Sequence, residues 1–85
     1  MVINTWKQYW EIYEQLCDSL NDRGCRDITF ELDKIKLLIN GSRPGYRDFL
    51  KGLRSLVNRQ RDQFTKPERH IAQALLAEME DALKK

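Results

Sequence analysis

The sequence has no long apolar run, and this absence excludes the simplest kind of membrane protein. A helix that crosses a bilayer needs about 18 or more predominantly apolar residues, and no run in these 85 residues approaches that length. The first residues, MVINTW, also lack the basic region and the long apolar region of a secretory signal peptide. We therefore expect no membrane partner and a cytoplasmic location.

Cysteine and histidine are scarce, which argues against a metal site and against most kinds of catalysis. Cys17 and Cys25 lack CxxC spacing, and a reducing compartment disfavours a disulfide between them. His70 is the single histidine, and no cysteine or carboxylate lies at a helical spacing that would orient its ring. Ser42 and Ser55 have no visible base, and GSRPG is too short for a phosphate-binding loop. We expect no enzymatic activity, no metal or other cofactor, and no small-molecule substrate.

The composition is that of a small soluble domain. Hydrophobic residues make up 41% of the chain and charged residues 33%, which is too apolar for a disordered tail and too charged for a membrane protein. A chain of 85 residues allows one domain, so we expect a single helical domain over residues 1–85. A domain of this size buries only about 60 to 65% of its unfolded surface, so its stability margin is small and oligomerisation stays open.

Apolar residues recur with the period of a helix in four segments. The predicted helices cover residues 5–21, 28–40, 45–63 and 67–84. Thr5 to Gln8 and Thr65 to Glu68 match capping boxes, in which a threonine and a residue three positions later satisfy backbone N–H groups at a helix start. Because the connections are short, neighbouring helices should pack antiparallel. The prediction is an all-α fold, a small compact bundle of four helices.

The second segment is ambiguous, because DITFEL alternates apolar and polar residues like a short strand. We interpret it as a helix capped by Asp27, since no other stretch offers a partner strand. The helical interpretation places Phe30 and Leu37 on the face away from the inward isoleucines. Either this helix runs through the middle of the bundle, or Phe30 and Leu37 form a surface for a partner.

Two tryptophans lie four residues apart near the start of the chain. Trp6 and Trp10 belong to the inward arc of the first predicted helix, and aromatic residues in such a position usually belong to the core. The end of a helix is often thinly covered, however, so both rings are also candidates for a dimer interface. The predicted oligomer or partner interface therefore comprises Phe30, Leu37, Trp6 and Trp10.

Basic residues form a ridge along the third predicted helix. Residues 43–70 hold eight lysines or arginines and three acidic residues, and no acidic residue of this helix enters the sector of the ridge. The predicted binding residues for an acidic partner are Arg43, Arg47, Lys51, Arg54, Asn58 and Arg61.

Three interpretations of this basic ridge stay open. It contacts nucleic-acid phosphates, it meets an acidic protein surface such as Glu11, Glu14 and Asp18 of another copy, or it is only the solvated side of a core helix. We favour the second. The sequence then predicts a small non-enzymatic helical binding module that acts through protein–protein interaction and self-associates, as an adaptor, regulator or inhibitor. Nucleic-acid binding through the basic ridge is the alternative.

Overall fold

The computed structural model describes residues 3–84 as four α-helices joined by short connections. The helices are α1 (Trp6–Asp22), α2 (Arg26–Lys36), α3 (Arg43–Arg59) and α4 (Lys66–Lys84), and one turn of 3-10 helix, η1 (Arg61–Gln63), lies between α3 and α4. No strand occurs within residues 3–84. The predicted all-α bundle of four helices is confirmed.

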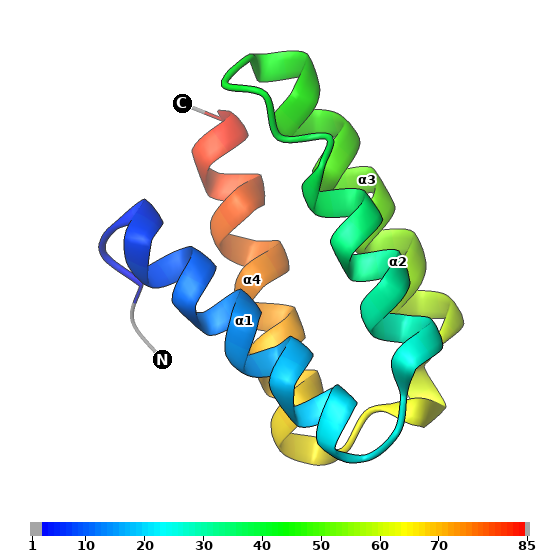
Figure 1. Cartoon of the computed structure of the whole chain (residues 1–85). Coiled ribbons are helices and arrows are strands. Elements are labelled where there is room, and N and C mark those ends of the chain that lie inside the picture. Colours follow the sequence, from blue (N-terminus) through cyan, green and yellow to red (C-terminus); the bar gives the residue numbers. More distant parts are fainter. Residues whose placement is uncertain (1–2, 85) are drawn as a thin grey trace.

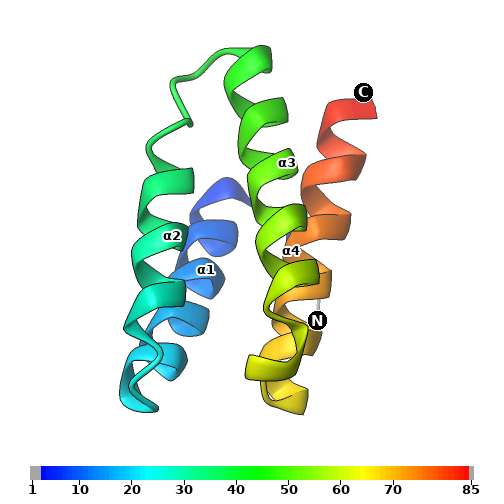
Figure 2. The ribbon, with the colours of Figure 1, turned by 90° about the vertical axis from the view of Figure 1, so that its right-hand side faces the viewer.

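The helices run alternately up and down around a common core (Figures 1 and 2). Each helix packs against its neighbours in sequence, and α4 also packs against α1, so α1 and α3 lie at diagonal corners, as do α2 and α4. The bundle has two different ends. The start of α1, the α2–α3 connection and the end of α4 share one end, here called the terminal end, and the α1–α2 and α3–α4 connections share the other, the loop end (Figure 1).

The core is made of the inward faces of all four helices. Two buried tyrosines satisfy their hydroxyls on backbone carbonyls: Tyr9 donates to Leu75 O at 2.9 Å and Tyr13 donates to Leu32 O at 2.7 Å. Burial raises the pKa of both tyrosines well above the ordinary value, so both stay neutral. The buried apolar residues are Tyr9, Tyr13, Leu16, Leu20, Ile28, Leu32, Phe49, Leu50, Leu53, Leu56, Val57, Phe64, Ala72, Leu75, Leu76 and Met79.

Both predicted capping boxes are present, one of them in altered form. At the start of α4, Glu68 N donates to Thr65 Oγ1 at 3.3 Å, and Thr65 N donates back to Glu68 Oε1 at 2.9 Å. At the start of α1, Gln8 N donates to Thr5 Oγ1 at 3.1 Å, but the Gln8 side chain accepts from Asn4 N at 2.8 Å and not from Thr5. Side chains therefore satisfy N–H groups that the helices leave unpaired at both starts.

The second helix is shorter than predicted. It begins at Arg26 after Cys25, so that Asp27 lies in its first turn and is not the cap, and it ends at Lys36 instead of residue 40. The next residues form the tighter i to i+3 backbone hydrogen bonds, and in one of them Ile39 N donates to Lys36 O at 3.1 Å. Gly41, at φ +80°, turns the backbone toward α3 in a conformation that side chains with a Cβ rarely adopt.

The third helix also differs from its predicted bounds of 45–63. It begins two residues earlier, with Ser42 as cap and a proline in its first turn, and it ends at Arg59 before η1. Gly52 lies against α2, where an added Cβ would come within 3.1 Å of Ile35. Its missing side chain therefore permits the close approach of α2 and α3. Gly45 is tighter still, because its Cβ would lie 2.6 Å from Leu38 O.

None of the helices within residues 3–84 combines the length and the apolar character that a membrane crossing requires.

Candidate interaction surfaces

The structure divides the basic ridge into two groups. Arg47, Lys51 and Asn58 are exposed on the outer side of α3, and Arg61 is exposed in η1. These four residues form no ion pair with another residue in the range 3–84.

The other two ridge arginines hold α3 against α4. Arg54 forms an ion pair with Glu80, and the Arg43 guanidinium donates to the backbone carbonyl of Leu83. Leu83 lies in the last turn of α4, where carbonyls lack partners within the helix. The ridge sector is thus free of acid along α3, as predicted, but Glu80 enters it from α4. This neighbour could not be recognised in the sequence of α3 alone.

A further arginine, Arg59, connects α3 to α2 through Glu31, with 2.9 Å between Nη2 and Oε2. Both partners are partly exposed, so the pair contributes little to stability.

The acidic residues of α1 lie far from the basic ridge. Glu11, Glu14 and Asp18 are all exposed on α1, and α1 is diagonal to α3 in the bundle. The two charged surfaces therefore point away from each other within one copy. A contact between them requires a second molecule.

At the loop end, one carboxylate is buried that sequence reasoning treated only as a capping residue. Glu68 is 1% exposed. Its carboxylate forms an ion pair with Arg23, accepts from Arg23 Nε at 3.1 Å and accepts from Ser19 Oγ at 2.5 Å. Arg23 Nη2 also donates to Gln63 O at 2.7 Å. The cluster thereby joins α1, η1 and α4.

The titration of Glu68 reflects this environment. Burial on its own raises the pKa of the carboxyl group, but hydrogen bonds from Arg23, Ser19 and the Thr65 backbone outweigh that effect and lower the pKa to about 2. The same hydrogen bond raises the pKa of Arg23. Every oxygen of Glu68 has a partner, so the cluster is a structural link and offers no free group for catalysis. The capping pattern locates Glu68, but no pattern identifies Arg23, 45 residues away, as its partner.

Phe30 and Leu37 lie on the outer surface of α2 and not in the middle of the bundle. Phe30 is 63% exposed and Leu37 is 82% exposed, and the neighbouring Leu38 is 42% exposed. The Lys34 ammonium lies 5.2 Å from the centre of the Phe30 ring. Leu37 is the C-cap, the residue directly after the end of α2. We call Phe30, Leu37 and Leu38 the α2 apolar patch.

The two tryptophans have different environments. Trp10 is half-buried, in edge contacts with Tyr13 and Phe49 at 5.5 and 5.4 Å between ring centres, and the Lys36 ammonium lies 5.4 Å from its ring centre. Trp6 is 45% exposed and stacks on Tyr46 of α3, with 5.7 Å between ring centres and 18° between planes. Trp10 therefore contributes mainly to the edge of the core, whereas Trp6 presents much of its indole to solvent.

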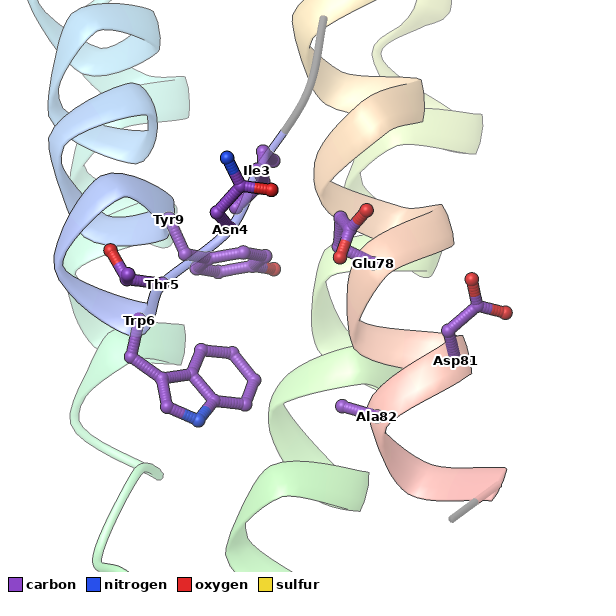
Figure 3. Close-up of a pocket in the computed structure, with 8 residues that line it drawn as sticks. All are labelled: Ile3, Asn4, Thr5, Trp6, Tyr9, Glu78, Asp81 and Ala82. Atoms are coloured by element: carbon purple, nitrogen blue, oxygen red, sulfur yellow. The ribbon is translucent and has the colours of Figure 1, made fainter.

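Two cavities adjoin Trp6 at the terminal end. One, of about 330 Å³, lies between the start of α1 and the end of α4, and Figure 3 shows Trp6 and Tyr9 on one side of it and Glu78 and Asp81 on the other. A second, of about 230 Å³, is lined mostly by apolar side chains from α1, α3 and α4. Trp6 and Ala82 line both cavities. Sequence reasoning singled out Trp6 but not the carboxylates opposite it, because it could not tell that α4 lies beside α1.

The groups that could support other chemistry are not brought together. Within residues 3–84 no three histidine, cysteine or acidic side chains converge in a way that could hold a metal ion. His70 is exposed. Both cysteines are free and half-buried, and burial raises the pKa of the Cys17 thiol to about 11, which makes this thiol a poor nucleophile.

Comparisons with protein-family models, with curated proteins and with solved structures give no match to this chain.

Proposed function

We propose that this chain is a protein-binding module that self-associates, and that the α2 apolar patch makes the central contact. The observation that carries the proposal is the exposure of Phe30 and Leu37, at 63% and 82%. The two residues are seven positions apart on a helix, which places them on one face two turns apart. The fold of a single copy does not require apolar side chains at these two positions, because α2 already packs inward through Ile28 and Leu32.

The chemistry of the patch favours a protein partner. Aromatic and aliphatic anchors at the centre of an interface, with polar groups at the rim, typically carry most of the binding energy. Lys34 and Lys36 lie in the last turn of α2, beside the patch, and supply such a rim. A small bundle with a modest core also gains stability from association.

The opposed charged surfaces support self-association in particular. Asp18 and its acidic neighbours on α1 point away from Lys51 and the free cations of α3, so a second copy can present one surface to the other. Exposed ion pairs are individually weak, but complementary charge steers encounter and fixes the orientation of partners.

The test is the solution mass as a function of concentration. Analytical ultracentrifugation of the full chain should show a dimer or a larger species at tens of micromolar, and Phe30→Asp or Leu37→Asp should shift it to monomer. Both side chains are exposed, so circular dichroism should show unchanged helix content. A suitable control is Gln15→Ala, which alters an exposed residue of α1 that belongs to neither the patch nor the charged surfaces. A strictly monomeric wild type would contradict self-association.

The second candidate function is nucleic-acid binding, and the observation in its favour is the free set of Arg47, Lys51 and Arg61. Phosphate contacts release counterions, so affinity for duplex or single-stranded nucleic acid should fall as salt rises. Because Arg43 and Arg54 already hold α4, we expect a shallow slope set by about three phosphate contacts.

The variant that tests this candidate reverses the charge of Arg47, Lys51 and Arg61 to glutamate together and leaves the arginines that hold α4 untouched. Its control makes the same change in charge at three other exposed residues, Lys7, Arg26 and Lys66. Loss of binding in the first variant but not in the control would favour nucleic acid. Equal binding by the two variants would rule out the basic ridge as a phosphate site.

A further inference from the structure

The terminal end holds a site whose chemistry matches a side-chain pair on α2. The two cavities beside Trp6 share two lining residues, Trp6 and Ala82. The apolar cavity measures about 230 Å³, and a cavity of about 150 Å³ already holds a benzene molecule. It therefore has room for one branched aliphatic side chain.

The larger cavity of this site is acidic, whereas Arg43, which donates to Leu83 O, lines the apolar cavity. Glu78 and Asp81 lie three residues apart on α4, so they share a face, and both line the larger cavity opposite Trp6 (Figure 3). Neither carboxylate forms a hydrogen bond or an ion pair with another residue in the range 3–84. An aromatic ring beside two free carboxylates favours a cation with an alkyl stem, through ion pairing and cation–π attraction.

The end of α2 carries the complementary groups. Leu37 is an aliphatic side chain that is 82% exposed. Lys34 precedes it by three residues, is exposed, and lies on the same outer face of the helix. An apolar side chain and a cation thus project together from one turn.

We infer that Leu37 of one copy docks in the apolar cavity of a second copy, with Lys34 beside Glu78 and Asp81. The inference rests on the proposed self-association and names its receiving surface. The occupant is a second copy and not the chain's own α2, because α2 and α4 lie at diagonal corners of the bundle. The high exposure of Leu37 likewise excludes insertion within one molecule.

This arrangement has a consequence for the form of the assembly. The interface joins two different surfaces, so each bound pair keeps one unused Leu37 and one unused receiving site. Such a contact continues into an open chain, or closes into a ring when the rotation between copies permits. A symmetric contact of two α2 apolar patches would stop at a dimer.

The experiment uses two variants that each remove one half of the contact. Leu37→Asp removes the docking side chain and leaves the receiving site intact. Glu78→Lys combined with Asp81→Lys reverses the charge of the receiving site and leaves α2 intact. A matched control, Asp22→Lys combined with Asp27→Lys, makes the same change in charge at the loop end, where both residues are exposed.

We expect each of the two variants alone to associate at least about thirtyfold more weakly than the wild type, as for a hot-spot residue, and the control to associate within about threefold of it. An equimolar mixture of the two variants should form a one-to-one heterodimer and nothing larger, because only one productive contact remains. Adding Lys34→Glu to the reversed receiving site should restore self-association.

The outcomes separate this inference from the proposed function. If Leu37→Asp gives monomers while the reversed receiving site associates like the wild type, the proposed self-association stands and the terminal-end site is wrong. If the wild type is monomeric, both the proposed self-association and the terminal-end docking site are wrong. A mixture that stays monomeric also overturns the inference, provided that circular dichroism shows both variants folded. Ala82→Leu, which adds bulk to a residue that lines both cavities without altering charge, should weaken association in the same way.

Discussion

The two ends of the bundle place carboxylates of the same helix in opposite environments. At the loop end, Glu68 is 1% exposed and is held by Arg23, Ser19 and the Thr65 backbone. At the terminal end, Glu78 and Asp81 border an open cavity and form no ion pair within residues 3–84. A buried charge whose hydrogen bonds are satisfied fixes structure, whereas a solvated carboxylate without a protein partner is available to a ligand or another molecule.

The apolar residues at the two ends differ in the same way. Near the loop end, Leu20 is fully buried, while at the terminal end Trp6 is 45% exposed although its side chain is larger. Packing at the loop end therefore stabilises a single copy. At the terminal end, a large apolar surface stays in contact with water, which costs free energy unless another molecule covers it.

The sharpest way to test this contrast is to truncate the core at the loop end. Leu20→Ala should lower the free energy of unfolding by about 3 kcal/mol, because it removes apolar contacts and leaves a cavity. Urea denaturation followed by circular dichroism measures this loss. A loss below about 1 kcal/mol would mean that the loop end is packed less tightly than its burial implies.

Neutralising the buried carboxylate should have the next largest effect. Glu68→Gln should cost about 2 kcal/mol at neutral pH, because the ion pair is lost inside the protein. Glu78→Gln, the matched change at the terminal end, should stay within about 0.5 kcal/mol. Comparable losses for the two variants would abolish the distinction between the ends.

Lowering the pH should protonate the same carboxylate, Glu68, and destabilise the fold. The pKa of Glu68 is about 2 in the folded chain and about 4.3 in the unfolded chain. Since the folded pKa is the lower one, its contribution to stability is complete above the unfolded pKa and is lost as the pH falls through the folded pKa. Unfolding measured between neutral pH and pH 2 should show this loss in the wild type, and Glu68→Gln should flatten that part of the profile.

At the terminal end, the α2–α3 connection packs closely against the first turn of α3. A Cβ at Gly45 would lie 2.6 Å from Leu38 O and would also overlap the Asn40 side chain. Gly45→Ala should therefore cost about 1 to 2 kcal/mol, although alanine favours helix more than glycine does. Thermal unfolding measures the difference. A stabilised variant would show that this connection moves easily.

The smallest expected effect is that of Trp6 on the stability of a single copy. Trp6→Leu should cost about 1 kcal/mol or less at concentrations where the chain is monomeric, because it removes chiefly the stack on Tyr46. The same variant should weaken self-association far more than it weakens folding. Comparing dilute and concentrated samples in thermal unfolding separates the two effects.

Much of the fold followed from local patterns. The helix period and the capping residues Thr5 and Thr65 predicted four helices with approximately correct bounds, because these signals act over a few neighbouring residues. The ends of α3 and α2 were each predicted four residues too late, and the end of α2 shows why. The apolar residues Leu37 to Ile39 continue the periodic pattern there, but the chain must already turn toward α3.

The candidate surfaces were only partly predictable. The sequence identified Phe30, Leu37 and Trp6 as candidates for an interface, and it identified the basic ridge. It could not separate Arg54, which pairs with Glu80, from Lys51, which has no such partner, because the partner comes from another helix. For the same reason, the sequence did not show that Glu78 and Asp81 lie opposite Trp6.

The helices, their inward faces and the polarity of charge along the chain can be derived from the amino-acid order, because periodicity and capping depend on residues close in sequence. The packing of the helices decides which carboxylate is buried and which stays free. It also decides that α1 and α3 face opposite ways and that Trp6 borders two cavities. These properties depend on which helices become neighbours, and that arrangement arises from packing between residues that are far apart in the chain.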